Sequence, residues 1–419
     1  MIRKNNNRNY KNSSDNVLSS ASKTMSESVL SEVTENNEVA ENTEPEKNAP
    51  DTAKEPIVID SDKATAIYTL WFGLDYGSIL TSYAIYNVAR QLGKKPYLLE
   101  KHPELWGEHY TDRNNIAGKF ITKNCDILEV FSDENAKNAL SEIRTHIIGS
   151  DILWDNNIVG KQTDKYYYLS DISDQDKKKI SFGTSLGGHN VEVDRRNDYC
   201  ILLNKFNCIS VKSLDESMRL SDMYYICPEI VLDPVFLCDM EKYTECAEGS
   251  VANEIEQENS FIFTYMKNGN SRKKDFILRG NRALMENHLS PLRNFIDINR
   301  FPESRAAIGL EPAFHILADD WLHYIINSDF VITDDYYGMC FALMFEKNFA
   351  VLVDRETENL SLYTTLLEQL KLSERLVFTD DDFMAKEYLF RKPVKYKGVS
   401  EKLEKLRTDS LNWFKNNLG

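Results

Sequence analysis

Long apolar runs are missing from this sequence, because no stretch of 18 or more consecutive apolar residues occurs in it. We therefore expect no transmembrane segment. The first residues, MIRKNNNRNYKN, have no apolar segment behind them, which argues against a secretory signal peptide. Positive charge is also scarce: 50 Lys and Arg stand against 66 Asp and Glu. The resulting net charge of −16 disfavours a nucleic-acid partner, whose phosphate backbone would be repelled.

Metal-ligand and disulfide spacings are missing as well. The seven Cys include no C-x-x-C pair, and the seven His include no H-E-x-x-H spacing. An odd set of Cys without paired spacing predicts reduced thiols, as in a cytoplasm, rather than a disulfide framework or a zinc site. We expect a cytoplasmic protein that needs neither a metal nor a bound cofactor.

Aromatic residues are nearly absent from the first 62 residues, where Tyr10 is the single one. This stretch is rich in Asn, Ser, Glu and Thr and contains twelve acidic residues against seven basic ones. Such a composition cannot bury enough apolar surface to offset the chain entropy, so we predict a disordered tail. The tail is either an inert linker or a tether, and its composition leaves both open.

The ordered part of the chain alternates strand patterns with helix patterns. Residues 64–72 predict a strand, GLDYGS a turn, and ILTSYAIYNVARQLG an amphipathic helix that ends at Gly93. Asp233-Pro234 and the acidic segment after it indicate a boundary, beyond which a second series of strands and helices begins. We predict two Rossmann-like domains, 63–238 and 239–419, that face a cleft. The last helix is compatible with a return to the first domain.

One stretch, residues 327–345 (NSDFVITDDYYGMCFALMF), combines a buried strand, a polar turn and a buried helix. In open parallel sheets, ligands bind at such turns, beside the carboxyl ends of the strands. Similar small and polar residues follow the other predicted strands, and together they form the candidate site. Its residues from these turns are Tyr76, Gly77, Gly149, Ser150, Asp151, Ser185, Gly187, Lys212, Thr333, Asp334 and Gly338. The alternative is that these turns contain Gly, Ser and Asp only because such turns favour them.

The ordered motifs resemble the polysaccharide pyruvyl transferase family across most of residues 65–415. The resemblance is carried by the motifs LDYGSILTSYAIYNVARQLG, HIIGSDILWD, SFGTSLGG, CISVKSLDES, VLDPVFL and DDWLHYIINSDFVITDDYYGMCFALMF, in this order. It implies a fold similar to that of two-domain glycosyltransferases of the B type. It also implies transfer of the enolpyruvyl unit of phosphoenolpyruvate to two hydroxyls of a sugar, giving a pyruvate ketal on a cell-surface glycan.

The expected partners are thus phosphoenolpyruvate and a glycan or lipid-linked sugar acceptor. An anionic donor needs fixed cations, for which we single out Lys212, Lys267 and the Arg272–Lys274 cluster. The cluster has a second interpretation, a solvated loop. Trp154 and Tyr76 are candidates for stacking on a sugar face, or are core aromatics.

Three departures from the family pattern are visible, one of which is that the family's Arg-Phe pair is missing near residues 358–362. Tyr337 stands where the family has His, and Lys212 stands where it has Arg. We therefore assign catalysis to Tyr337, Asp334 and His189, the last of which follows SFGTSLGG and is able to supply an imidazole. Two alternatives remain: a nucleotide-sugar glycosyltransferase that uses Asp334 and Asp335, or a glycan-binding protein that kept the fold and lost the reaction.

Overall fold

The computed structural model describes residues 57–72, 75–103, 116–155, 165–173, 175–187, 195–250, 261–286, 294–297, 317–357 and 359–419. All of them lie in one structural unit of the chain, Pro56–Gly419. Most of the predicted tail, residues 1–56, lies outside the described residues. Residues 57–62, which we assigned to the tail, are described. Ile57 and Ile59 among them pack against the core, so the ordered chain begins before Ala64.

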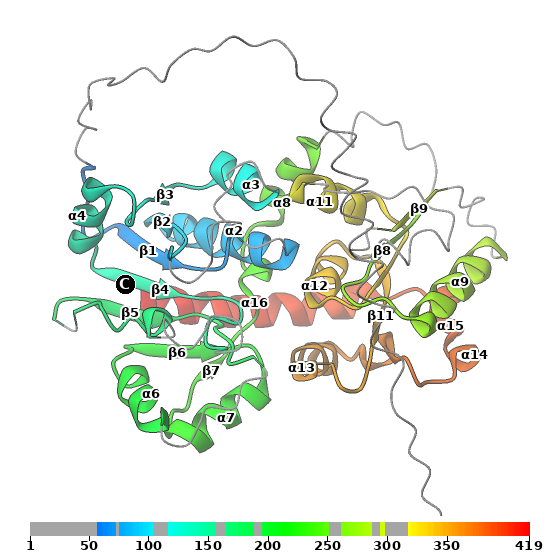
Figure 1. Cartoon of the computed structure of the whole chain (residues 1–419). Coiled ribbons are helices and arrows are strands. Elements are labelled where there is room, and N and C mark those ends of the chain that lie inside the picture. Colours follow the sequence, from blue (N-terminus) through cyan, green and yellow to red (C-terminus); the bar gives the residue numbers. More distant parts are fainter. Residues whose placement is uncertain are drawn as a thin grey trace, which may run out of the picture. The chain divides into compact units, whose positions relative to one another are not determined.

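Two all-parallel sheets form the framework of the chain (Figure 1). The first has the strand order β3-β2-β1-β4-β5-β6-β7. Its strands are β1 (Ala64–Tyr68), β2 (Lys95–Leu99), β3 (Ile127–Leu128), β4 (Thr145–Ile148), β5 (Lys178–Ser181), β6 (Cys208–Val211) and β7 (Glu229–Ile230). Strands β1, β4 and β5 are almost wholly buried, as is typical of a parallel sheet covered on both faces.

The helices of this half alternate with its strands. They are α2 (Tyr76–Gln91), α3 (Ile116–Asn124), α4 (Glu134–Glu142), α6 (Arg196–Leu203), α7 (Leu214–Tyr224) and α8 (Met240–Glu248), with short 3₁₀ turns η2 (Tyr166–Tyr168) and η4 (Pro234–Phe236). Two of them begin at a predicted polar turn. The Asp75 carboxylate accepts from the Gly77 amide at the start of α2, and Ser213 accepts from the Glu216 amide at the start of α7.

The second sheet has the order β12-β11-β10-β8-β9. Its strands are β8 (Phe261–Tyr265), β9 (Asn294–Asp297), β10 (Phe330–Thr333), β11 (Asn348–Val353) and β12 (Leu376–Phe378). The helices are α9 (Ser271–Glu286), α11 (Ala318–Asn327), α12 (Tyr336–Met344), α13 (Leu360–Leu370), α14 (Phe383–Lys386), α15 (Tyr388–Arg391) and α16 (Tyr396–Leu418), with a 3₁₀ turn η6 (Ser373–Arg375). The predicted class, two parallel α/β sheets of Rossmann type, is confirmed.

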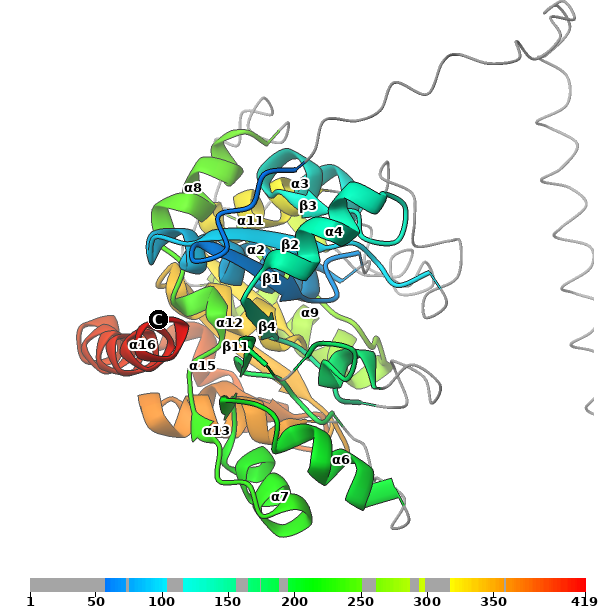
Figure 2. The same ribbon diagram turned by 90° about the vertical axis from the view of Figure 1, so that its left-hand side faces the viewer.

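The last helix, α16, returns to the first sheet. At its start the Tyr396 hydroxyl donates to the carbonyl of Lys347, at the second sheet. Near its end the Ser410 hydroxyl accepts from the Leu232 amide, and the Phe414 ring packs 4.5 Å from that of Phe182. Figure 2 shows α16 and α4 on opposite sides of the first sheet. The closing helix therefore ties the two sheets together.

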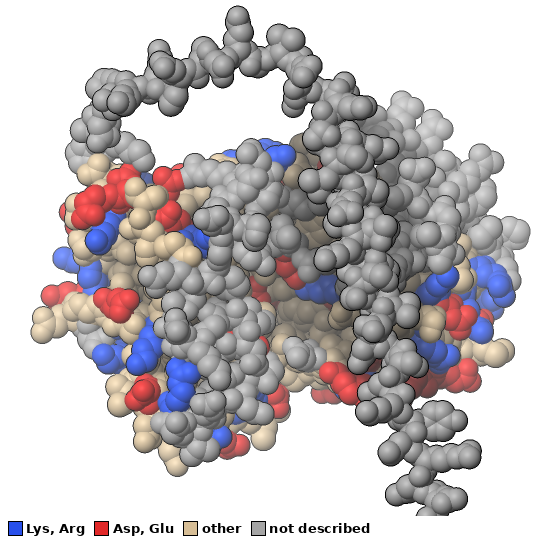
Figure 3. Space-filling view, in the orientation of Figure 1, with Lys and Arg blue, Asp and Glu red and all other residues tan. Residues whose placement is uncertain are grey.

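The surface carries both signs of charge. On the face drawn in Figure 3, acidic and basic side chains are interspersed over the described residues. No helix of the described residues is both long and apolar enough to cross a membrane.

His146 is a buried titratable group in the middle of β4. Its side chain is 0% exposed, and burial lowers the pKa of its imidazole from 6.5 to about 4. Between these two values the unfolded chain binds a proton that the folded chain does not. The contribution of His146 to the free energy of unfolding is therefore complete above pH 6.5 and is lost as the pH drops towards 4. At pH 4.5 this loss amounts to roughly 2–3 kcal/mol.

Urea unfolding of the wild type and His146→Gln at pH 7 and pH 4.5 measures this loss. We expect the wild type to lose roughly 2–3 kcal/mol more than the variant between the two pH values. Equal losses in both proteins would show that His146 does not titrate in this way.

Candidate functional site

The two sheets direct the carboxyl ends of their strands to one cavity of about 710 Å³. In the first sheet the strand order reverses between β1 and β4, and in the second between β8 and β10. Such reversals open a crevice at the strand ends, where ligands bind in parallel sheets. Asp75 and Asp151 follow β1 and β4, while Lys267 and Asp334 follow β8 and β10, and all four line the cavity.

Six of the predicted site residues line this cavity. They are Asp151, Ser185, Lys212, Lys267, Asp334 and Tyr337. The turn after β10 and the turns after β4 and β5 therefore open to the same cavity.

Four further predicted residues lie behind the cavity wall and shape its turns. Ser150 donates to the carbonyl of Gly183, and Thr333 donates to the carbonyl of Tyr265. Gly149 has a φ of +130°, and a Cβ atom there would lie 2.2 Å from the Phe182 carbonyl oxygen. At Gly338 a Cβ would lie 2.6 Å from the Thr333 hydroxyl. Ser150 and Thr333 thus hold the turns through their hydroxyls and the two glycines through the close approach of their backbone, and none of the four lines the cavity.

Two aromatic candidates are corrected by their burial. Trp154 is 0% exposed, stacks on Tyr168 and donates its Nε1–H to the carbonyl of Tyr167. Tyr76 is 6% exposed and stacks on Trp321, with ring centroids 5.5 Å apart. Both rings are already covered by other aromatic rings, so both are core residues and not platforms for a sugar.

Gly187 and His189 complete the predicted set. Gly187 has a φ of +61°, and a Cβ there would lie 2.1 Å from the Asp155 carboxylate. Its role is therefore to let the chain turn beside Asp155. His189 lies outside the described residues, so its role as an imidazole donor stays a prediction.

A buried ion pair lies at the base of the cavity. The Lys212 Nζ atom is 2.9 Å from Asp233 Oδ2, and the two side chains are 3% and 0% exposed. The same ammonium lies 5.6 Å from the ring centres of both Tyr336 and Tyr337. Burial alone would lower the pKa of Lys212, but the nearby carboxylates of Asp233 and Asp151 raise it, so the lysine stays charged.

Asp151 and Glu216 present buried carboxyl groups around this ion pair. The Ser78 hydroxyl donates to Asp151 at 2.5 Å, and the Ser185 hydroxyl donates to Glu216. Burial raises the pKa of both carboxyls above their usual values, against the opposing effect of Lys212 and of the donating hydroxyls. Both groups therefore take up a proton more readily than exposed carboxylates do.

Lys267 links the turns of the two sheets. Its Nζ atom lies 2.5 Å from Asp75 Oδ2 and 2.6 Å from Asp335 Oδ2. These carboxylates also begin helices α2 and α12, where they accept from the amides of Gly77 and Gly338. Lys267 therefore fixes two helix starts relative to each other.

The Asp334 carboxylate holds the loop that follows β8 through hydrogen bonds to its backbone. It accepts from the backbone amides of Lys267 and Asn268 at 2.6 and 3.0 Å, and from Lys273 Nζ at 2.7 Å. Lys273 is 3% exposed, so the solvated-loop interpretation of the Arg272–Lys274 cluster is wrong for this residue. Since both Asp334 oxygens are already engaged, the carboxylate is better suited to positioning the loop than to acting as a base.

The Tyr337 side chain lies at the wall of the cavity. Within the described residues its oxygen is buried and forms no hydrogen bond, although the side chain lines the cavity. Burial raises the pKa of this phenol well above its usual value, so the hydroxyl stays protonated at neutral pH. A buried hydroxyl without a partner is costly unless a ligand supplies one.

Sequence reasoning missed several residues that surround the site. We had interpreted Asp233 only as a domain boundary before Pro234. The other missed residues either follow a strand or lie in the first turn of a helix. The set is Asp75, Ser78, Glu216, Asp233 and Tyr336. Asp75 carried a usable signal, because an Asp directly before a helix pattern is a common cap.

Gly77 leaves room for the Tyr337 ring. A Cβ at this position would lie 2.0 Å from Cδ2 of Tyr337. Gly77→Ala is thus expected to displace the ring and to lower the free energy of unfolding by about 1–3 kcal/mol. In a Tyr337→Ala background most of this cost should vanish, which urea unfolding of both single variants and the double variant would measure. Equal costs in the two backgrounds would contradict the contact.

Gly398→Ala is the matched control, since Gly398 lies in α16 and a Cβ added there would have nothing within 4 Å of it. There the substitution should stabilise the helix by about 0.5–1 kcal/mol, because Ala favours helix over Gly.

The family model for polysaccharide pyruvyl transferases matches residues 75–354, which include 13 of the 18 described residues that line the cavity. The chain belongs to this family. The resemblance inferred from the sequence motifs is therefore confirmed. No curated protein matches the sequence.

Solved structures show distant similarity. A glycosyltransferase from Rickettsia africae is 13% identical, with a TM-score of 0.45, over 85% of this chain and 96% of the other. A UDP-GlcNAc 2-epimerase from Neisseria meningitidis, bound to UDP-GlcNAc, is 12% identical, with a TM-score of 0.48, over 85% and 99%. Both TM-scores are below 0.5, and neither similarity bears on what this polysaccharide pyruvyl transferase family member binds.

Proposed function

We propose that the cavity transfers the enolpyruvyl unit of phosphoenolpyruvate to two hydroxyls of a glycan or lipid-linked sugar, forming a pyruvate ketal. The observation that carries this proposal is Tyr337, at the position where the family has His: its hydroxyl has no hydrogen-bond partner among the described residues, and its ring lies beside the charged Lys212. The Tyr337 hydroxyl is able to donate a hydrogen bond, although its raised pKa makes proton transfer slow, and the Lys212 ammonium is able to attract the anionic donor.

The reaction forms two C–O bonds at C2 of the donor and breaks one. The donor methylene carbon gains a proton, and the oxygen of the first sugar hydroxyl bonds to C2 of the donor while losing its own proton. The oxygen of the second hydroxyl then bonds to C2 as the C2–O bond to phosphate breaks, and its proton leaves with the phosphate. Asp151, which lines the cavity and whose pKa is raised by burial, is the candidate to accept the proton of the first hydroxyl.

The acceptor side of the proposal rests on the carboxylates. Among the described lining residues, Asp and Glu outnumber Lys by six to two: Asp75, Asp151, Asp334, Asp335, Asp354 and Glu356 against Lys212 and Lys267. Carboxylate oxygens are good acceptors for sugar hydroxyls.

The seven cysteines are free thiols, which supports a reducing compartment such as the cytoplasm.

The same charge balance favours a second candidate, a glycan-binding protein that has lost the transfer reaction. Both lining lysines are ion-paired, so an anionic donor has to compete with carboxylates for them. A neutral sugar meets no such competition.

Thermal unfolding with added ligands distinguishes the candidates, because a ligand that binds the folded state raises its stability by about 2.7 kcal/mol at a hundredfold excess over Kd. Phosphoenolpyruvate should raise the melting temperature and release phosphate when a sugar acceptor is present. Stabilisation by neutral oligosaccharides alone would favour the binding protein. Stabilisation by nucleotide sugars alone would favour a glycosyltransferase and overturn the proposal.

A further inference from the structure

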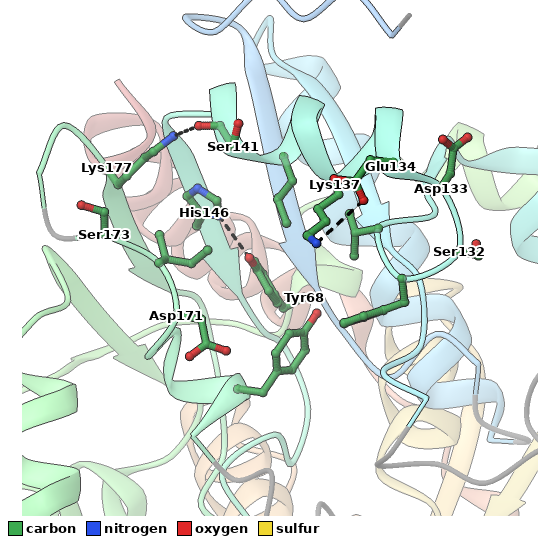
Figure 4. A pocket seen from close by; sticks show the side chains of 15 residues that line it. Tyr68, Ser132, Asp133, Glu134, Lys137, Ser141, His146, Asp171, Ser173 and Lys177 are labelled. Atoms are coloured by element: carbon green, nitrogen blue, oxygen red, sulfur yellow. Dashed lines mark hydrogen bonds and ion pairs between the residues drawn. The ribbon is translucent and has the colours of Figure 1, made fainter. Parts of the chain in front are cut away.

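A second cavity, of about 850 Å³, lies against the face of the first sheet that α4 covers (Figure 4). It is bounded by β1, β4, α4 and the loops before α4 and after η2. Among the described residues it shares no lining side chain with the first cavity. None of the roles argued above uses it.

Aromatic rings form much of its wall. Tyr68, Phe131 and Tyr166 line it, and the Tyr166 ring lies 5.5 Å from Tyr68 and 6.0 Å from Phe131, between ring centroids. Phe131 is 43% exposed and therefore reaches solvent at the edge of the cavity. Such a wall suits a ligand with one apolar face, because aromatic rings offer large flat contact areas.

Hydroxyl groups lie deeper in the cavity. His146 Nε2 lies 3.0 Å from the Ile143 carbonyl oxygen and so carries the proton, which leaves Nδ1 to accept from the Tyr68 hydroxyl at 3.2 Å. The Tyr166 hydroxyl oxygen is buried and, within the described residues, has no hydrogen-bond partner. A ligand that fills the cavity therefore meets one hydroxyl that needs a partner and one whose oxygen still accepts.

The charged side chains disfavour an anion. Lys137 is paired with Glu134 at 3.8 Å, and Lys177 donates to the carbonyls of Ser141 and Ile143 at 2.6 Å each. Asp171 lines the opposite side (Figure 4). Since Lys177 is engaged, Lys137 has a carboxylate beside it and acidic groups line the cavity, a neutral, hydroxyl-bearing ligand fits this lining best.

We infer that this second cavity binds a neutral pyranose ring. The apolar face of the ring lies on Phe131 and Tyr166, and its hydroxyls bond to the Tyr166 hydroxyl and to the acidic side chains. The inference goes beyond the proposed transfer, because it requires no reaction and no residue of the first cavity. A glycan longer than one unit would gain a second point of attachment on the same protein.

Saturation-transfer NMR with the full chain tests the inference, using the methyl glycosides of glucose, galactose and mannose as probes. Phe131→Ala should weaken binding of the best glycoside by up to about tenfold, and Tyr166→Phe by a smaller factor, since it removes only one hydrogen bond. Tyr166→Phe keeps the ring and Phe131 is exposed, so both variants should fold, which thermal melting checks.

Tyr388→Ala is the matched control. Tyr388 lies in α15, is 41% exposed and lines neither cavity, so its substitution should leave binding unchanged. Adenosine and inorganic phosphate are the competing probes. The inference is overturned if no glycoside binds, if adenosine or phosphate binds here in place of the glycosides, or if both cavity variants bind as well as the wild type. Loss of binding in these variants with unchanged phosphoenolpyruvate turnover would support this site without bearing on the first.

Discussion

Tyr337→His is expected to raise pyruvyl transfer from phosphoenolpyruvate by about 10²–10⁴-fold, the usual value of a matched general acid. Burial raises the pKa of Tyr337 well above its usual value, so the phenol gives up its proton reluctantly near neutral pH. The unperturbed pKa of an imidazole is near neutrality, far below that of a phenol, so a histidine is the better proton donor of the two. Phosphate release in the presence of a sugar acceptor, with the ketal identified by mass spectrometry, measures the rate.

Tyr337→Phe is the control for this experiment. It removes the hydroxyl and keeps the ring that packs against Gly77 and lies near Lys212. If Tyr337 is a poor donor, the wild type and Tyr337→Phe should both be slow. A wild type that transfers pyruvate rapidly, and loses the activity in both variants, would show that Tyr337 is the working acid.

Lys212→Met is expected to lower the free energy of unfolding by about 3–5 kcal/mol, because it leaves the buried Asp233 carboxylate without its partner. Asp233 also accepts from Thr81 and from the Val235 amide, bonds that an amide side chain is able to keep. The double variant Lys212→Met/Asp233→Asn should therefore recover most of the loss. Urea unfolding measures all three variants.

The exposed pair Lys242–Glu245 provides the comparison. Its side chains are 42% and 55% exposed, so Lys242→Met should cost no more than about 1 kcal/mol. If Lys212→Met costs as little as Lys242→Met, or if the double variant is as unstable as Lys212→Met, then the pair does not have the role in stability that its burial implies.

The predictions for Tyr337 and Lys212 both depend on the buried Lys212–Asp233 ion pair, beside which the Tyr337 ring lies. Lys212 holds its charge in a buried place because Asp233 and Asp151 raise its pKa. The same carboxylates balance most of the positive charge of Lys212, which weakens its attraction for an anionic donor. A donor that binds here has to bring enough negative charge to compete with Asp233, or bind together with a proton on Asp151.

The sequence alone determined the parallel α/β class, because its strands are short apolar runs that alternate with helix patterns. It also located the turns after β4, β5, β6, β8 and β10, since each apolar run ends where Gly, Ser, Asp or Lys begins. The family followed from six ordered motifs, of which the GSDILW piece and the WLHYIINSDFVITD run are specific when they occur together. These features are local, so they can be recognised without knowing which segments meet.

Contacts between distant segments were decided only by the tertiary structure. Asp233 lies 21 residues from Lys212, and Lys267 binds carboxylates from turns more than 60 residues away on either side. Trp154 and Tyr76 have the composition of sugar-binding residues, yet neighbouring rings from other elements cover both. Gly77 was expected to admit a ligand and instead admits the ring of Tyr337. Which polar groups are paired, and which are left for a ligand, depends on three-dimensional packing that no local pattern records.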